Sequence, residues 1–197
     1  MCSATRAAGS ADRPMFFDPN ARVDVVTLRD ERETDVEAIG RVIVAAFAGE
    51  PRGGQLERQI VAALRADRAL TVSLVAERDG QVVGHVAFSP VAIGAETAEA
   101  AQWYGLAPLA VLPDCRRQSI GAGLVRTGLD ALRRLGARGC VVLGEPAYYT
   151  RFGFAQFDDI VFPSAPREYF LALPFDEAAL RPSGSVRYHD AFHRDHA

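Results

Sequence analysis

Two β-rich segments joined by an Asp-Gly turn constrain the fold of this chain more than any other feature. Residues 70–77 and 81–93 are rich in apolar and β-branched residues, and Arg78-Asp79-Gly80 lies between them. Asp-Gly between two such runs is a strong hairpin signal, because the turn needs residues that accept a positive φ. The two segments are therefore predicted to pair as antiparallel strands.

The other segments alternate between strand-like and helix-like patterns. Apolar residues recur at spacings of three and four within the predicted helices, and in short continuous or alternating runs within the predicted strands. Strands are predicted at 23–28, 103–112, 140–143, 168–175 and 186–188, and helices at 34–47, 56–66, 119–135 and 146–152. A hairpin-rich first half followed by a β-α-β unit predicts one α/β (α+β) domain with a mixed sheet flanked by helices.

The domain is predicted to span residues 23–188. Residues 1–22 are expected to be a flexible arm and residues 189–197 a polar tail. His189, His193 and His196 in that tail have metal-ligand spacing only if the tail is helical, so a polar tail is preferred to a metal site.

Composition excludes several classes of protein. All 22 basic residues are arginine, so a lysine Schiff base and the P-loop lysine are both excluded. The net charge of −3 and the lack of a basic run argue against nucleic-acid binding, and the lack of a long apolar stretch argues against a membrane span. Three cysteines without CxxC spacing indicate a reduced, cytoplasmic protein.

The segment 109–124 carries the most chemical information. It reads as a strand, a tight turn with Arg116 and Arg117, and a helix that begins among small residues such as Gly121 and Gly123. Free N–H groups at a helix start, together with arginines, can bind a pyrophosphate. A helix start with solvated arginines explains the residues equally well at this stage, whereas a dinucleotide fingerprint fits poorly because the third glycine is missing.

This segment resembles the acetyl-CoA signature of the GNAT N-acetyltransferase superfamily. Residues 116–121, Arg-Arg-Gln-Ser-Ile-Gly, match the family's Gln/Arg-x-x-Gly-x-Gly/Ala, except that Ser119 replaces the first glycine. Leu109-Ala110-Val111 and Pro113 resemble the family's preceding strand, and residues 149–154 resemble its Tyr-x-x-x-Gly-Phe block. Residues 144–149 and 186–189 further resemble the YhbS-like subgroup.

The resemblance implies an acetyl-CoA-dependent N-acetyltransferase whose mostly antiparallel sheet splays between its fourth and fifth strands. It implies that Tyr149 is the general acid, that an amine of a small molecule or peptide attacks the thioester directly, and that no metal is needed. Backbone groups of Leu109, Ala110 and Val111 would hold pantetheine. The residues implied at the pyrophosphate of acetyl-CoA or CoA are Arg116, Arg117, Gln118, Ser119, Ile120, Gly121, Ala122 and Gly123. A non-catalytic CoA or acyl-CoA sensor is the alternative.

The general base and the choice between two tyrosines stay open, and several other residues are expected to have structural roles. Glu145, Glu50, Glu168 or water could serve as the general base, and Tyr148 competes with Tyr149. At Ser119, a required positive φ would strain the loop, whereas helical dihedral angles would make serine harmless, and the second is expected because serine is favourable at a helix start. Residues 102–106 could form a strand edge that pairs across a homodimer. Cys115, Cys140, His85, Trp103, Tyr104, Phe88 and Tyr169 are more readily explained by packing than by a functional site.

Overall fold

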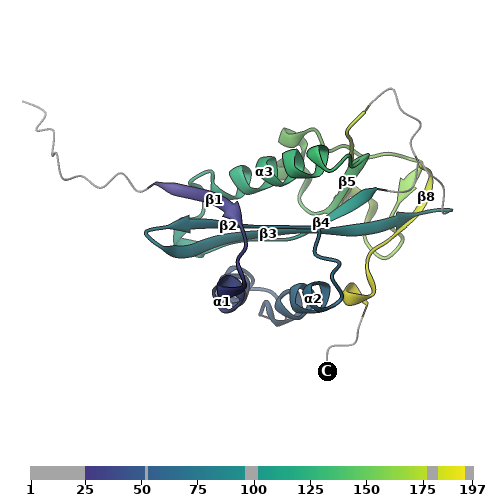
Figure 1. The fold of residues 1–197 in the computed structure, drawn as a ribbon. Coiled ribbons are helices and arrows are strands. Elements are labelled where there is room, and N and C mark those ends of the chain that lie inside the picture. The colour runs from purple at the N-terminus through teal and green to yellow at the C-terminus, as the bar shows by residue number, and fades with distance from the viewer. Residues whose placement is uncertain (1–24, 52, 96–101, 177–181, 194–197) are drawn as a thin grey trace, which may run out of the picture.

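The computed structural model describes residues 25–51, 53–95, 102–176 and 182–193. A central sheet with the strand order β1-β2-β3-β4-β5-β7 separates two layers of helices, and β8 pairs with the end of β3 (Figure 1). All pairs on this main path are antiparallel except β4 with β5, which are parallel. The mixed, mostly antiparallel sheet predicted from the sequence is confirmed.

The strands lie close to the predicted segments, with ends that differ by a few residues, except that the short β6 was not predicted. Residues 1–22, the predicted arm, and the first two residues of the predicted strand 23–28 lie outside the described part. The strands are β1 Val26–Asp30, β2 Val72–Arg78, β3 Gln81–Ile93, β4 Trp103–Val111, β5 Gly139–Leu143, β6 Ile160–Val161, β7 Phe170–Pro174 and β8 Gly184–Arg187.

The predicted hairpin is confirmed. β2 and β3 pair from Val72 opposite Phe88 to Arg78 opposite Gln81, and the turn residues Asp79 and Gly80 both have positive φ, at 51° and 75°. The turn therefore uses the backbone freedom that made Asp-Gly informative in the sequence.

Helices cover both faces of the sheet. α1 and α2 lie on one face and α3 on the other (Figure 1). The α-helices are α1 Val36–Ala46, α2 Gln55–Ala66, α3 Ile120–Arg134 and α4 Pro146–Tyr149. Short 3-10 turns are η1 Glu33–Asp35, η2 Pro113–Cys115, η3 Thr150–Phe152, η4 Arg167–Tyr169 and η5 Asp190–Phe192.

The face of α3 that was predicted to be apolar forms the centre of the largest core cluster. Ile120, Leu124, Leu129 and Leu132 are buried against β2, β3 and β4. Leu135, which was predicted to face the same way, is instead 57 % exposed, because the helix has already ended at Arg134. The packing fixes the N-terminus of α3 beside the end of β4.

β4 separates from β5 halfway along its length. The two strands pair from Trp103 opposite Gly139 to Leu106 opposite Val142, and β4 then continues to Val111 without β5. At this point Ala107 and Pro108 together lie opposite the single residue Ala87 of β3, which makes a β-bulge. Proline has no N–H for a strand ladder and is therefore suited to this position. The splay between the fourth and fifth strands is present as expected.

Residues 102–106 do not offer a free strand edge. Trp103 to Leu106 pair with β5 on one side and with β3 on the other. The idea that this segment pairs across a homodimer is therefore wrong, because both of its edges are already occupied within the chain.

The start of the predicted polar tail is part of the folded structure. His189 accepts a hydrogen bond from the Ala191 backbone N–H through Nδ1 at 3.2 Å, and this contact caps η5. Ala191 is completely buried beside Ile60 and Leu64 of α2. His196 lies outside the described residues.

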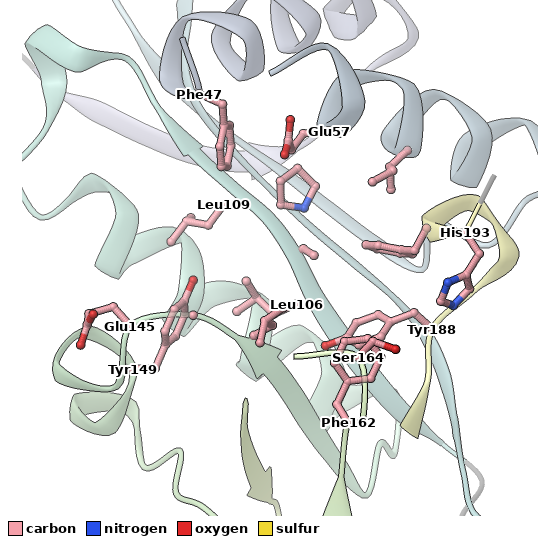
Figure 2. A pocket seen from close by; sticks show the side chains of 16 residues that line it. Phe47, Glu57, Leu106, Leu109, Glu145, Tyr149, Phe162, Ser164, Tyr188 and His193 are labelled. Carbon is pink, nitrogen blue, oxygen red and sulfur yellow. The ribbon is translucent and has the colours of Figure 1, made fainter. Parts of the chain in front are cut away.

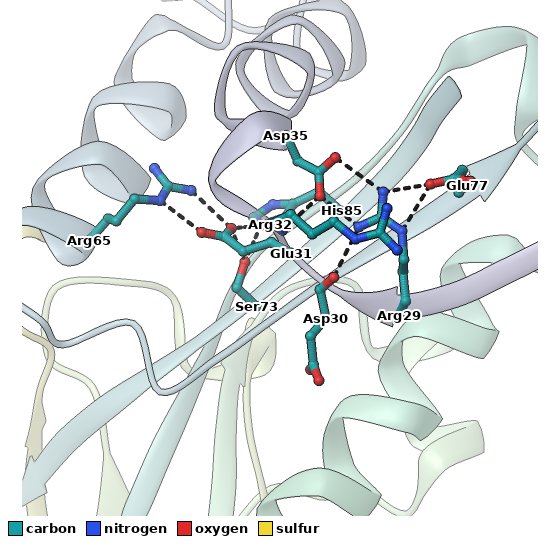
Figure 3. A network of polar contacts seen from close by, with 9 residues as sticks. All are labelled: Arg29, Asp30, Glu31, Arg32, Asp35, Arg65, Ser73, Glu77 and His85. Carbon is teal, nitrogen blue, oxygen red and sulfur yellow. Dashed lines mark hydrogen bonds and ion pairs between the residues drawn. The ribbon is translucent and has the colours of Figure 1, made fainter. Parts of the chain in front are cut away.

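A polar network ties β1 to β2, β3 and α2 (Figure 3). Ser73 donates to Glu31, Arg65 donates to the same carboxylate at 2.8 Å, and the Ser73 hydroxyl lies 2.9 Å from Nε2 of His85. Burial would raise the pKa of Glu31, but the hydrogen bonds from Arg65 and Ser73 outweigh burial and lower it. The interpretation of His85 as a hydrogen-bonded strand residue is confirmed.

The burial of His85 predicts a stability that falls in acid. The side chain is fully buried, and burial lowers its pKa from 6.5 to about 4 despite the nearby Glu31 carboxylate. Between these values the unfolded chain binds more protons at His85 than the folded chain, so acidification from pH 6.5 to 4 should reduce the free energy of unfolding by about 3 kcal/mol.

Denaturant titrations of the wild type and of His85→Gln across that pH range test this expectation. Glutamine keeps a partner for Ser73 but cannot titrate, so the variant should lose stability less steeply as the pH falls. Parallel pH profiles for the two proteins would show that His85 is not responsible.

Candidate functional site

The loop between β4 and α3 has an unusual backbone. Arg117 has a φ of 61° and Ser119, the residue that precedes the helix, has a φ of 62°. The expectation that Ser119 has helical dihedral angles is wrong: it occupies the left-handed region, which glycine accepts most readily. The position does require a positive φ, and serine fills it at some conformational cost.

This turn leaves N–H groups free at the start of α3. The first-turn amides of Ile120, Gly121 and Ala122 have no intrahelical acceptor, as in any α-helix. Gly123 differs, because its N–H already donates to the Ser119 carbonyl at 2.9 Å. The first turn of the helix can therefore offer the amides of Ile120, Gly121 and Ala122 to an anion, but not that of Gly123.

Some side chains of the loop bond to other parts of the protein, and others are exposed to solvent. Arg116 donates to the Ala46 carbonyl at the end of α1 at 2.5 Å, so its guanidinium is engaged in joining β4 to α1. Gln118 accepts from Arg78 at 2.9 Å and donates to the Asp114 carbonyl at 3.1 Å. The exposed side chain of Arg117 is the one best placed to meet an anion at this loop.

A cavity of about 650 Å³ lies over this loop, and we call it the loop cavity. Its walls come from the loop, the start of α3, the end of α1 and two residues after β5. The lining residues are Ala46, Phe47, Glu50, Leu109, Val111, Cys115, Arg116, Arg117, Ser119, Ile120, Gly121, Ala122, Tyr148 and Arg151. A Cβ at Gly121 would come within 2.8 Å of the Tyr148 hydroxyl, so glycine at this position leaves room for the Tyr148 side chain in the cavity wall.

A second cavity, of about 610 Å³, lies where β4 leaves β5, and we call it the strand cavity (Figure 2). Phe47 and Leu109 line both cavities, so the two meet at these side chains. The full lining is Phe47, Glu57, Ile60, Leu106, Ala107, Pro108, Leu109, Leu143, Gly144, Glu145, Tyr149, Phe162, Ser164, Tyr188, Phe192 and His193.

Tyr148 and Tyr149 face different cavities. Tyr149 lines the strand cavity and Tyr148 lines the loop cavity, with their rings edge to face at 5.0 Å. A Cβ on Gly144 would lie 2.4 Å from Cε2 of Tyr149, so the ring packs directly on that glycine. Burial raises the pKa of the Tyr149 phenol, and its hydroxyl is therefore protonated at neutral pH.

The carboxylates considered as bases lie in different places. Glu145 is exposed at the rim of the strand cavity and accepts from the Ala147 N–H at 3.3 Å, which caps α4. Glu50 is exposed at the loop cavity, whereas Glu168 is exposed on η4 and lines neither cavity. Sequence reasoning missed Glu57 of α2, whose carboxylate projects into the strand cavity (Figure 2). The spacing of apolar residues in 56–66 predicted a helix, but it gave no sign that Glu57 faces a cavity.

The other side chains singled out from the sequence have packing roles. Trp103 and Phe88 are buried in the core, Tyr104 packs against the core, and Tyr169 is 41 % exposed away from both cavities. Cys140 is completely buried, and burial raises the pKa of its thiol. Cys115 is buried and accepts from Arg78 at 2.7 Å. The aromatic residues that do line the strand cavity are Phe47, Tyr149, Phe162, Tyr188 and Phe192.

Within the described residues no group of three or more acidic, histidine or cysteine side chains is arranged to hold a metal ion. None of the helices in that part of the chain is long and apolar enough to cross a bilayer.

Residues 35–154 match the acetyltransferase (GNAT) family, a span that runs from η1 through the loop to Phe154. The chain belongs to the GNAT family of acetyltransferases. The N-acetyltransferase YhbS of Escherichia coli K12 is 38% identical over 172 residues, which cover 85% of this chain and 98% of YhbS. The N-acetyltransferase YjhQ from the same strain is 35% identical over 62% of this chain and 65% of YjhQ.

Two solved GNAT structures share the fold of this acetyltransferase. The E. coli YhbS structure in complex with CoA has a TM-score of 0.79 at 37% identity and covers 91% of this chain and 97% of YhbS. A GNAT acetyltransferase from Brucella melitensis in complex with acetyl-CoA has a TM-score of 0.73 at 47% identity and covers 86% of this chain and 99% of that protein. The likeness to the YhbS-like subgroup is thereby confirmed.

The left-handed conformation of Ser119 predicts how this acetyltransferase responds to substitution there. Ser119→Val should lower the free energy of unfolding by about 1–2 kcal/mol, because a β-branched side chain is poorly tolerated at positive φ. Ser119→Gly should be neutral or slightly stabilising. Denaturant unfolding measures both changes.

Ser185→Val is the matched control, because Ser185 is an exposed serine in the extended strand β8, where a β-branched residue is well accommodated. Equal stability of Ser119→Val and the wild type would contradict the backbone conformation described for the loop.

Proposed function

We propose that this GNAT protein transfers an acetyl group from acetyl-CoA to a primary amine of a small molecule or peptide. The observation that carries the proposal is the meeting of two cavities at Phe47 and Leu109, beside the part of β4 that β5 does not cover. One cavity suits the cosubstrate and the other suits the acceptor. The transfer would take place at their junction, next to Tyr149.

The residues around the loop cavity fit acetyl-CoA. The amides of Ile120, Gly121 and Ala122 and the side chain of Arg117 would bind the pyrophosphate, supported by the positive end of α3. Arg116 would act indirectly by holding the loop to α1. CoA and acetyl-CoA in the E. coli and B. melitensis relatives support this assignment.

The uncovered part of β4 would hold the pantetheine arm. Leu109, Ala110 and Val111 continue the strand beyond the last pair with β5, so backbone groups on that side are available to amides of a ligand. This is the ligand counterpart of adding a strand to a sheet edge. Their side chains would contribute less than their backbone, since Ala110 is buried on the α1 face.

The thioester supplies an activated acetyl group, and the chain supplies position and protons. The amine nitrogen forms a bond to the acetyl carbon while the carbon–sulfur bond breaks. Tyr149 would donate its proton to the departing thiolate and regain one from the nitrogen of the new amide. The protonated state of the buried Tyr149 phenol supports that role.

The proposal also covers the cellular compartment and the class of acceptor. Cys115 and Cys140 are free thiols, which supports a reducing cytoplasm. The acceptor would be an amine compound and not a nucleic acid or a lipid surface, consistent with a chain of net charge −3.

Release of free thiol from acetyl-CoA with a panel of primary amines tests the proposal. We expect turnover with at least one amine, and Tyr149→Phe should lower kcat about 100-fold with little change in acetyl-CoA affinity. Tyr169→Phe, an exposed tyrosine outside both cavities, should behave like the wild type.

Two results would contradict the proposal. Tight CoA binding without turnover of any amine would favour a non-catalytic CoA or acyl-CoA sensor. Full activity of Tyr149→Phe together with loss of activity in Tyr148→Phe would transfer the acid role to the other tyrosine.

A further inference from the structure

Glu57 carries an unsatisfied carboxylate oxygen in the strand cavity. It lies in the first turn of α2, and its Oε2 is buried without a hydrogen-bond partner. A buried carboxylate oxygen without a donor is expensive in free energy unless a ligand supplies one. The Glu57 side chain lines the cavity that also contains the Tyr149 ring, and a small rotation of the carboxylate would let a molecule bound there supply the missing donor (Figure 2).

The charge of the strand cavity favours a cation. Its lining includes two acidic residues, Glu57 and Glu145, and one histidine, His193, and among the described residues that line it there is no arginine. The chain has no lysine either. An ammonium group would be attracted by the two glutamates, whereas a carboxylate on the same molecule would meet them with no arginine or lysine beside it.

The walls of the strand cavity favour a ligand in which the ammonium group is attached to a compact apolar group. Beyond Glu57 the lining is dominated by aromatic and aliphatic side chains that come from several separate segments, and Ile60, Pro108, Phe162 and Phe192 are examples. Polar groups reappear at the far end, where His193 and Ser164 lie close to Tyr188 (Figure 2). One hydrogen-bonding group at the far side of an aromatic ring would therefore be accommodated.

We propose that Glu57 is the catalytic base of this acetyltransferase and that its acceptor is a primary amine on an apolar or aromatic body without a carboxylate. The inference rests on the proposed function and assigns its acceptor side. Glu57 takes one proton from the bound ammonium, which leaves a neutral amine to attack the acetyl carbon. A second proton leaves the nitrogen as the amide forms and replaces the one that Tyr149 gives to the thiolate, and Glu57 releases its proton to solvent.

Glu57 is better suited to this role than Glu145. The Glu145 side chain already accepts a hydrogen bond from the Ala147 N–H and is exposed to water. Glu57 comes from the opposite wall to Tyr149, so an amine between them would have its base and the thiolate's acid on different sides (Figure 2). This arrangement separates the proton that leaves the ammonium before the attack from the proton that the thiolate receives.

The test compares Glu57→Gln, Glu57→Asp and the wild type in the thiol-release assay. The amines are 2-phenylethylamine, tyramine, phenylalanine and spermidine. We expect the wild type to prefer the first two by at least tenfold in kcat/KM. Glu57→Gln should lower that kcat/KM about 100-fold, the aspartate should recover part of it, and CoA affinity should change less than twofold.

Glu168→Gln is the matched control, because Glu168 is a glutamate exposed on η4 outside both cavities. It should retain wild-type kinetics. Competition by 2-phenylethanol adds a binding readout: the neutral alcohol should compete weakly with the amine in the wild type and relatively better in Glu57→Gln.

The outcomes separate this inference from the proposed function. Absence of turnover with every amine would remove the proposed function, and this inference with it. Turnover in which Glu57→Gln stays within threefold of the wild type would overturn only the role of Glu57. Preference for phenylalanine or spermidine would overturn the acceptor class.

Discussion

The end of the β4–β5 ladder is the constraint on which the rest of this structure depends. After Leu106 pairs with Val142, the bulge at Ala107 and Pro108 carries β4 away from β5. A sheet that stayed paired would fill the space now occupied by the strand cavity and would cover the backbone of Leu109 to Val111. Both cavities, and the position of Tyr149 beside them, follow from this separation.

Contacts from outside the sheet hold the separated strand in place. Arg116 joins the end of β4 to the end of α1 through the Ala46 carbonyl, and Gln118 joins the loop to Arg78 of β2. The buried apolar face of α3 fixes the amides that follow the loop. These contacts use side chains that were first assigned to ligand binding, and they give the loop a defined shape before any ligand is present.

The sequence predicted those parts of the molecule that depend on local signals. The Asp79-Gly80 turn placed the β2–β3 hairpin correctly, the spacing of apolar residues placed α3 correctly, and the two family blocks identified the family. The bulge in β4 was not predicted, although Pro108 is a local sign of it, since proline cannot serve in a central strand ladder. The positive φ of Ser119 was not readable in this way, because serine is also common at ordinary helix starts.

Features that depend on contacts between distant segments could not be predicted. Glu57 faces the cavity only because α2 forms the wall opposite Tyr149, and Ala191 is buried only because η5 packs onto α2. The strand edge imagined at 102–106 is occupied for the same reason, by strands distant in sequence. Such placements are set by the tertiary fold and leave little trace in local sequence patterns.

Amide hydrogen exchange with and without CoA tests the central claim most directly, because that claim concerns backbone groups. Slower exchange at Ile120 to Ala122 and along Leu109 to Val111 on CoA binding is the predicted result. CoA binding that leaves exchange in both segments unchanged would contradict the account.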